Sequence, residues 1–260
     1  MRRKDFLIGM GGLAIGVPLG AVGAASMLQP ESAPSAPPSG HVSYSQAGED
    51  LIVNHLLGRL KIKDISYLDI GAYDPILINN TYFFYKQGYR GVLVEPNVAM
   101  CEKLRTVRPR DTTLNAGIGI GKAGEADYYV MSEPSWNTFD KAEAEHQVKT
   151  TGGRVAIKEV RKMPLLNVND VMGEHFNGKA PTFLSIDAEG WHLAILKSID
   201  FKRFRPQVIC VETLVSGELR EIPEIPALLR TKGYVARGAS FPNTIFVEAK
   251  LLAQDAGPGA

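Results

Sequence analysis

Short apolar runs alternate with amphipathic stretches along most of the chain. The runs at 67–70, 92–94, 182–186 and 208–211 each have the length of a buried strand. An acid stands at or next to the carboxyl end of each run: Asp69, Glu95, Asp187 and Glu212. Stretches with helical spacing separate them, the clearest at 51–60, 98–107 and 222–232. Strands alternating with helices predict an open α/β sheet. Two last strands, 234–238 and 244–247, are joined by a short connection and are expected to pair antiparallel.

The stretch 66–96 has the pattern of a strand, a glycine turn, a helix and a second strand. Gly71 follows the first strand where the chain must turn sharply, and glycine tolerates the φ values of tight turns. A helix is expected within 79–87, ending at Gly88. Glu95 then closes the second strand, slightly beyond the interval at which an acid binds a ribose diol in nucleotide-binding sheets.

The glycine pattern limits the kind of nucleotide. A dinucleotide site needs three glycines spaced for close approach to a pyrophosphate, whereas this turn has only Gly71, followed by Ala72. Asp69, two places earlier, would repel phosphate and suit a ligand with a cationic amino acid part, such as S-adenosylmethionine. An ordinary strand-to-turn junction is the alternative for this stretch alone.

Asp187 and Glu189 flank the same predicted sheet edge as Asp69 and Glu95, and Glu212 repeats the pattern. Neighbouring carboxylates raise each other's pKa, so such a cluster either binds a cation or works as acid and base. Some of these acids could instead cap the helices that follow, and for Glu212 both interpretations stay open. A cation bridging Asp187 and Glu189 is possible, but no ligand motif requires one, and we predict no metal site.

Other candidate residues stand in loops and at strand ends. Asn115 ends a predicted third strand at 112–116, where its amide could hydrogen-bond an adenine edge. Ser45 or Gln46 could cap the first helix, or their segment could be a lid over the ligand. The loop 132–153 is expected to carry substrate contacts, and Trp136 is either a ligand wall or a core aromatic.

Composition excludes some classes of protein. The net charge of +1 does not suggest broad nucleic-acid binding, and the two cysteines have no metal-ligand spacing and form no disulfide framework. The length allows one domain, which we place at 41–250, with a disordered tail at 251–260. Oligomeric state and the acceptor cannot be derived from these patterns.

The amino terminus is a separate segment. Arg2, Arg3 and Lys4 precede an uncharged stretch rich in glycine and alanine, so 1–28 is predicted to be a signal sequence or membrane anchor. The start resembles a twin-arginine export signal, although Phe6 stands one place late. Residues 29–40 are rich in Pro, Ser and Ala and are expected to form a flexible linker. We therefore expect membrane association or export, with the side of the membrane open.

Eight short motifs occur in an order and spacing similar to those of one known family, from about Tyr44 to Val247. They are Ser45–Asp50, Asp69–Pro75, Asn80–Tyr82, Gly88–Gly91, Glu95–Asn97, Asn137–Phe139, Ser185–Gly190 and Gly233–Tyr234. On these motifs the chain resembles the FkbM family of S-adenosylmethionine-dependent methyltransferases. The resemblance implies a Rossmann-like class I methyltransferase fold, with a mostly parallel seven-stranded sheet and an antiparallel closing hairpin.

The same resemblance implies roles for individual residues. Asp69, Gly71 and Ala72 would hold the methionine part of S-adenosylmethionine, Glu95 with the adjoining Pro96 the ribose, and Asp187 would face the methyl donor. The family commonly methylates hydroxyls of sugars and natural products, so a small-molecule or glycan hydroxyl is the expected acceptor.

One position departs from the family pattern, because His192 stands where a further acid is common. A histidine there is either a general base for the acceptor hydroxyl, with Asp187 and Glu189 as the other candidates, or a residue at a helix start. Two other functions stay open: an exported, non-catalytic module that binds glycans or surfaces, and an NAD-linked oxidoreductase, which the missing glycines disfavour.

Overall fold

The computed structural model describes residues 40–215 and 220–255. The chain divides into two units, Met1–Val42 and Ser43–Ala260, and the architecture below is that of the second. The predicted signal or anchor at 1–28 and nearly all of the predicted linker at 29–40 lie outside the described residues. No helix within the described ranges is long and apolar enough to cross a membrane.

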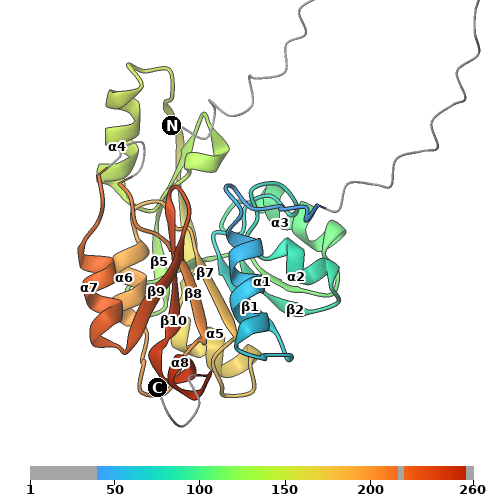
Figure 1. The fold of residues 1–260 in the computed structure, drawn as a ribbon. Helices are drawn as coiled ribbons and strands as arrows, with labels where there is room; N and C mark the ends of the chain where they lie inside the picture. Colours follow the sequence, from blue (N-terminus) through green and yellow to red (C-terminus); the bar gives the residue numbers. More distant parts are fainter. Residues whose placement is uncertain (1–39, 216–219, 256–260) are drawn as a thin grey trace, which may run out of the picture. The chain divides into compact units, whose positions relative to one another are not determined.

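A seven-stranded sheet forms the centre of the second unit (Figure 1), in the order β3-β2-β1-β7-β8-β10-β9. Its strands are β1 (Ser66–Ile70), β2 (Arg90–Val94), β3 (Thr112–Leu114), β7 (Phe183–Ile186), β8 (Val208–Glu212), β9 (Tyr234–Ala239) and β10 (Asn243–Glu248). The first five in spatial order pair in parallel, and β10 pairs antiparallel with both β8 and β9. The predicted mostly parallel sheet with an antiparallel closing hairpin is therefore confirmed.

Helices cover both faces of this sheet. On one face lie α1 (Glu49–Arg59), α2 (Tyr82–Lys86) and α3 (Val98–Val107), and on the other α5 (Val168–His175), α6 (His192–Ser198) and α7 (Glu224–Thr231). Successive strand residues point to opposite faces, so Phe183 packs with the first group and Leu184 with the second. Strands that are buried on both faces explain the continuous apolar runs in the sequence.

A second, three-stranded sheet was not expected from the sequence. It pairs β4 (Gly117–Ile118) and β5 (Gly124–Met131) with β6 (Ile157–Leu166) between them. The 3₁₀ turn η1 (Pro134–Trp136) and helix α4 (Lys141–Thr150) lie between β5 and β6 in sequence. Trp136 packs partly buried against Met131 and Val155, so it contributes to the core of this smaller part.

The structure narrows the bounds of one predicted helix and corrects the predicted start of the carboxyl-terminal tail. The helix expected within 79–87 begins only at Tyr82, because the side-chain carbonyl of Asn79 accepts hydrogen bonds from the amides of Thr81 and Tyr82 and forms a turn. The tail predicted to be disordered from 251 is helical to Asp255 in α8 (Ala249–Asp255), where Leu252 packs against the core. Residues 256–260 lie outside the described ranges.

The segment before α1 is held by two buried acids. Asp50 accepts hydrogen bonds from the hydroxyls of Ser43 and Ser45 at 2.6 and 2.9 Å. Glu49, on the other side of the helix start, accepts from Asn243 at 2.8 Å. The Ser45 hydroxyl also accepts the Asp50 amide at 3.3 Å, which fits the capping interpretation of this segment.

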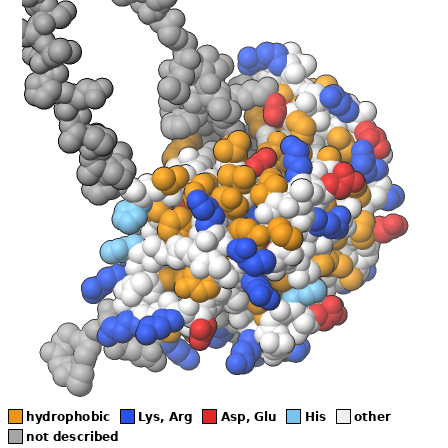
Figure 2. Space-filling view, turned by 90° about the vertical axis from the view of Figure 1, so that its right-hand side faces the viewer, with side chains coloured by type: hydrophobic (Ala, Val, Ile, Leu, Met, Phe, Trp, Pro, Cys, Tyr) orange, Lys and Arg blue, Asp and Glu red, His pale blue; other side chains and the backbone are white. Residues whose placement is uncertain are grey.

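Figure 2 shows the molecule turned so that its right-hand side in Figure 1 faces the viewer. Hydrophobic side chains gather in the middle of this face, with lysine and arginine side chains around them. The exposed large hydrophobic residues of the protein include Leu77 before α2 and Val98 and Val107 of α3. Acidic side chains are scattered singly over this face, in the hydrophobic area as well as at the margin.

Candidate active site

The turn after β1 lies directly against the end of β7. Gly71 has a φ of +83°, and a Cβ on it would come within 1.8 Å of the carbonyl oxygen of Asp187. Glycine is thus required for two reasons, the left-handed backbone and the absence of space. The amides of Gly71 and Ala72 donate to the carbonyl of Val94 at 2.9 and 3.3 Å, so they fasten this turn to β2. The loops after β1, β2 and β7 therefore meet at one edge of the sheet.

Glu95 is buried at the end of β2 with both carboxylate oxygens engaged. One oxygen accepts a hydrogen bond from the backbone amide of Tyr73 at 2.8 Å, and the other accepts one from the backbone amide of Asn97 at 2.7 Å. Burial raises the pKa of Glu95 to about 7, against the opposing effect of these two backbone hydrogen bonds. Because the Tyr73 bond links the strand end to the glycine turn, Glu95 belongs to the same site as Gly71.

Three of the acids predicted at this edge, Asp69, Glu95 and Asp187, lie close enough for their charges to affect one another. Asp69 and Asp187 both raise the pKa of Glu95 by charge repulsion, which is a smaller effect than burial. Asp187 likewise raises the pKa of Asp69. Three carboxyl groups from β1, β2 and the end of β7 therefore share one electrostatic environment, which favours a cationic ligand.

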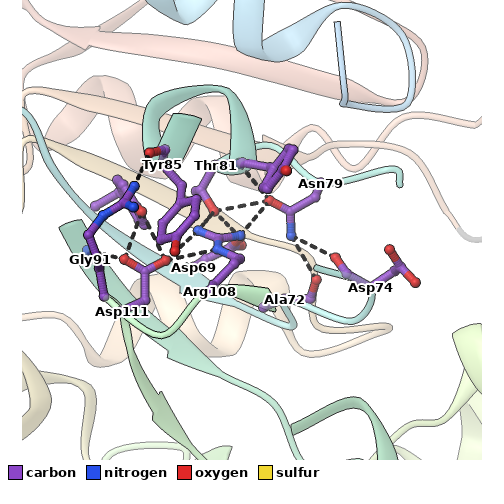
Figure 3. Close-up of polar contacts among 12 residues, drawn as sticks. Asp69, Ala72, Asp74, Asn79, Thr81, Tyr85, Gly91, Arg108 and Asp111 are labelled. Carbon is purple, nitrogen blue, oxygen red and sulfur yellow. Dashed lines mark hydrogen bonds and ion pairs between the residues drawn. The ribbon is translucent and has the colours of Figure 1, made fainter. Parts of the chain in front are cut away.

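Asp69 itself points into a buried polar network (Figure 3). Its carboxylate accepts a 2.7 Å hydrogen bond from the hydroxyl of Thr81. The guanidinium of Arg108, which is fully buried, donates to that same hydroxyl oxygen at 2.9 Å and to the side chain of Asn79 at 3.0 Å. Arg108 also forms an ion pair with the buried carboxylate of Asp111 at 2.8 Å. Burial raises the pKa of Asp69 to about 6, and the Arg108 charge opposes that rise.

This network supports the glycine turn from behind. The Asn79 amide donates to the carbonyls of Ala72 and Asp74, both at 3.0 Å. A contact of Asp69 with the methionine part of the cofactor stays a prediction, and its observed bonds are within the protein. Neither Arg108 nor Asp111 was predicted as a site residue, because the only local signal is a pair of opposite charges three residues apart, in a segment with the pattern of a turn.

Asn115 lies close to its predicted position but is turned inward. Its amide nitrogen donates to the carbonyls of Glu95 and Pro96 at 2.9 and 3.0 Å. The donor is therefore used to hold the turn after β2. Only the carbonyl oxygen of Asn115 is left for the predicted hydrogen bond to an adenine edge.

The ends of β7 and β8 bring a histidine between two acids. His192, the first residue of α6, has its Nε2 atom 3.9 Å from Oδ1 of Asp187 and 3.3 Å from Oε2 of Glu212. The imidazole is almost completely buried, whereas the two carboxylates are partly accessible. Of the two interpretations left open for Glu212, the structure places its carboxylate in the acidic cluster.

Glu189, the third predicted catalytic residue, lies in the loop between β7 and α6. Its φ is +28°, a strained value for a residue with a side chain. The hydroxyl of Thr138 donates to the carbonyl oxygen of Glu189 at 2.7 Å and holds this conformation. Trp191 stacks on Phe139 with ring centroids 5.3 Å apart, so the loop around residue 138 packs against the loop between β7 and α6. A catalytic role of the Glu189 carboxylate stays a prediction.

Comparisons with solved structures return methyltransferases. A TehB-like S-adenosylmethionine-dependent methyltransferase from Corynebacterium glutamicum is 8% identical, with a TM-score of 0.41, covering 78% of this chain and 88% of that one. An O-methyltransferase from Bacillus cereus, solved with S-adenosylhomocysteine, is 13% identical, with a TM-score of 0.36 and coverage of 81% and 82%. A precorrin-6y C5,15-methyltransferase from Geobacter metallireducens is 13% identical, with a TM-score of 0.37 and coverage of 74% and 84%. No curated protein matches the sequence.

The family comparison covers most of the folded unit. Residues 69–236 match the family model of the methyltransferase FkbM domain. The match begins at Asp69, contains the glycine turn, Glu95 and the Asp187–His192–Glu212 cluster, and extends into β9. It covers well over half of the chain and bears out the resemblance found in the motifs. The chain therefore belongs to the FkbM family of S-adenosylmethionine-dependent methyltransferases.

Proposed function

We propose that this methyltransferase transfers a methyl group to a hydroxyl oxygen of a sugar or another polyhydroxylated natural product. The observation that supports this most directly is the group of Asp187, His192 and Glu212 at the ends of β7 and β8. A hydroxyl must lose its proton when it is methylated, and imidazole and carboxylate groups are the usual acceptors. Asp187 also adjoins the glycine turn, so the cluster lies beside the proposed cofactor site.

The described residues fit S-adenosylmethionine, which is the cofactor of this family. Glu95 is a carboxylate at the end of β2, where it can accept hydrogen bonds from the hydroxyls of a ribose. The grouping of Asp69, Glu95 and Asp187 supplies negative charge for a sulfonium and an amino group. Because Gly71 has no side chain, the loops after β1 and β7 can lie in direct contact. Asp69 would favour S-adenosylmethionine binding through its negative charge and through the glycine turn that its hydrogen-bond network supports.

When bound, S-adenosylmethionine supplies a methyl carbon whose bond to sulfur breaks as the hydroxyl oxygen bonds to it, leaving neutral S-adenosylhomocysteine. The protein's part is to hold the hydroxyl in line and to remove its proton. We assign the positioning to Asp187 and the cluster around it, which would hydrogen-bond the hydroxyl. The imidazole of His192 is buried, whereas the carboxylates of Asp187 and Glu212 are partly accessible, so a proton accepted by the cluster could be passed on to solvent.

The proposal is tested with the purified full chain, S-adenosylmethionine and pairs of acceptors that differ only in one group. Each pair is a sugar and its amino sugar, for example glucose and glucosamine, extended to glycosides and polyols. S-adenosylhomocysteine formation is measured by mass spectrometry, and the methylated atom by NMR. Turnover with hydroxyl acceptors and a product methylated on oxygen would support the proposal. Methylation confined to the amino group would overturn it.

The alternatives raised by the sequence are separated by the same assay. Membership of a methyltransferase family decides against the NAD-linked oxidoreductase. The non-catalytic module would bind S-adenosylmethionine weakly or not at all and would release no S-adenosylhomocysteine with any acceptor. Protection from thermal unfolding by S-adenosylmethionine, measured first, reports binding without any knowledge of the acceptor.

We also propose that residues 1–28 direct the protein to a membrane or across it. The support is the basic start followed by an uncharged stretch in the sequence. A reporter that is active on only one side of the membrane, fused after Ala260, would locate the domain. Replacing Arg2 and Arg3 by Lys in the same fusion tests the twin-arginine route. Unchanged export in that variant would exclude it.

A further inference from the structure

Three chain segments bring an imidazole and two carboxylates to one point. They are the end of β7 with Asp187, the first residue of α6, His192, and the last residue of β8, Glu212. These elements lie next to one another in the fold (Figure 1). One donor atom from each residue lies within 4.8 Å of the other two. The group therefore combines residues that are distant in the sequence and are of the kinds that ligate metal ions.

The histidine in this group has an unsatisfied ring nitrogen. His192 is 3% exposed, and within the described residues its Nε2 atom has no hydrogen-bond partner. Oε2 of Glu212 is only 3.3 Å away, yet the contact does not meet hydrogen-bond geometry. Oε2 of Glu212 therefore does not lie on the axis along which Nε2 of His192 would donate or accept a hydrogen bond. Because buried polar atoms are nearly always satisfied, this nitrogen points to a ligand that completes the group.

Distances between the donor atoms suit a shared cation. Two ligands that each bind a metal ion at about 2.0–2.2 Å are separated by roughly 3–4 Å when they are neighbours in its coordination shell. The Nε2–Oε2 and Nε2–Oδ1 distances of 3.3 and 3.9 Å fall in that range. A metal ion would lie along the lone pair of Nε2, with each carboxylate oxygen to one side. We propose that Asp187, His192 and Glu212 bind one divalent transition-metal cation.

The ligand set indicates which cations fit. Carboxylates bind Mg²⁺, Ca²⁺ and Mn²⁺ well, whereas imidazole favours Zn²⁺, Fe²⁺ and other transition ions. A buried imidazole with two carboxylates therefore selects Mn²⁺, Fe²⁺ or Zn²⁺ over Mg²⁺. A direct hydrogen bond from the imidazole to the nearer carboxylate is the competing way to hold this group together, and the contact does not have that geometry.

This group differs from the cation bridge considered in the sequence analysis, which joined Asp187 to Glu189. Glu189 is not part of the group, and its backbone carbonyl is fixed by Thr138. Its place is taken by Glu212, which comes from the neighbouring strand β8. The sequence therefore contains all three ligands but no spacing that would reveal them, because they meet only through strand pairing.

A role of the cation in methyl transfer rests on the proposed function, whereas the binding of the cation by these three residues does not. Three protein ligands leave coordination positions open, and adjacent hydroxyl oxygens of a sugar or polyol can occupy them. Coordination to a divalent cation lowers the pKa of a bound hydroxyl, as it does for water, so that its proton passes to solvent. The oxygen then bonds to the methyl carbon while the methyl–sulfur bond breaks. His192 would act as a ligand in this case, and the preferred acceptor would carry vicinal hydroxyls.

Cation binding is measured with Mn²⁺, whose free form is counted by electron paramagnetic resonance. The full chain is freed of metal with a chelator, dialysed and titrated with Mn²⁺, alone and in competition with Zn²⁺. The expected result is one Mn²⁺ bound per chain and displaced by Zn²⁺. Binding should weaken at least tenfold in His192→Ala and in Asp187→Asn. His55→Ala, which removes an exposed histidine of α1, is the matched control and should bind as wild type does.

The outcomes separate this proposal from the proposed function. Asp187→Asn changes a partly exposed side chain and is expected to fold. If His192→Ala does not fold, Mn²⁺ binding by Asp187→Asn alone tests the metal site. Mn²⁺ should raise the thermal midpoint of wild type and of His55→Ala but not of Asp187→Asn. Absence of Mn²⁺ and Zn²⁺ binding to wild type, or binding by both site variants that is as tight as that of wild type, would overturn the metal site. Failure of wild type to bind S-adenosylmethionine would overturn the proposed function and leave the metal result standing.

Discussion

The hydroxyl of Thr81 donates a 2.7 Å hydrogen bond to the carboxylate of Asp69, and both side chains are buried. Arg108 donates to the same hydroxyl oxygen, so the hydroxyl joins the arginine to the acid. An acid at a strand end that was expected to face the cofactor is thereby tied to the body of the protein. Its negative charge still acts on the site, since Asp69 raises the pKa of Glu95.

Replacement of Arg108 tests this network. Arg108→Leu leaves Asp111 buried without its cation and removes the donors to Thr81 and Asn79. Breaking a buried ion pair by removing one partner costs about 3–5 kcal/mol, so a loss of that size in unfolding free energy is expected. Urea unfolding measures it. Arg105→Leu, at an exposed position of α3, is the control and should change stability by less than about 0.5 kcal/mol. Equal losses in both variants would contradict the described network.

Gly71 and Gly88, both with a left-handed backbone, make a matched pair for testing the turn after β1. Gly71→Ala would place a Cβ 1.8 Å from the carbonyl oxygen of Asp187, whereas at Gly88 nothing lies within 4 Å. Both substitutions incur the left-handed backbone penalty of about 1–2 kcal/mol. Gly71→Ala should be clearly more destabilising, and it alone should abolish protection by S-adenosylmethionine in thermal unfolding. Similar behaviour of the two variants would show that the close approach of Gly71 to β7 is not required.

The main sheet could be predicted because its signals are local. Apolar runs such as 182–186 mark strands, Gly71 and Gly88 mark turns, and acids at strand ends mark the edge of the sheet at which the candidate site lies. The second sheet could not, because β5 and β6 pair across the 3₁₀ turn η1 and helix α4 that lie between them in sequence. The sequence does predict strands at 126–131 and 155–161, but neither pattern shows which strand it pairs with.

Only part of the candidate site could be predicted, because local signals give the positions of residues along the chain but not their distant partners. Positions of Asp69, Glu95 and Asp187 along the sheet follow from strand ends, but the direction of each side chain depends on distant partners. Asp69 is turned by Thr81, and Glu212 joins His192 only because β8 pairs with β7. Arg108 has the local pattern of a turn residue, and only the folded chain shows that it is fully buried.

Thr138 is predicted to position the loop that carries Asp187 and Glu189. Thr138→Val keeps the shape of the side chain and removes its hydrogen bond to the carbonyl of Glu189. The loss should be about 1–3 kcal/mol of stability, because the buried carbonyl loses its partner. Turnover should fall, while the dissociation constant for S-adenosylmethionine stays within about twofold. Restoration by Thr138→Ser, which returns the hydroxyl, would identify the hydrogen bond as the cause. Equal turnover of the Val and Ser variants would contradict it.

The affinity for S-adenosylmethionine is predicted to rise with pH through the titration of Glu95. Burial raises the pKa of Glu95 to about 7, and its carboxylate form is the one that accepts hydrogen bonds from a ribose. Between pH 6 and pH 8 the ionised fraction grows from roughly one tenth to nine tenths, so the affinity should increase about ninefold. Calorimetric titration across this range measures it. Glu95→Gln should bind weakly at every pH, and Glu102→Gln, at an exposed position of α3, should follow wild type. A flat wild-type profile would exclude Glu95 as the ribose ligand.

The same carboxyl should affect the stability of the unliganded protein in the opposite sense. Its pKa of about 7 in the folded state lies above its usual value of 4.5, so the folded protein keeps a proton that the unfolded chain loses. The contribution to stability is complete below about pH 4.5 and is lost as the pH rises through 7, on the order of 3 kcal/mol in all. The difference in unfolding free energy between wild type and Glu95→Gln, measured at several pH values, isolates this group. That difference should fall steadily from pH 5 to pH 7.5 and then level off. A difference independent of pH would mean that the Tyr73 and Asn97 amides keep Glu95 ionised throughout, despite its burial.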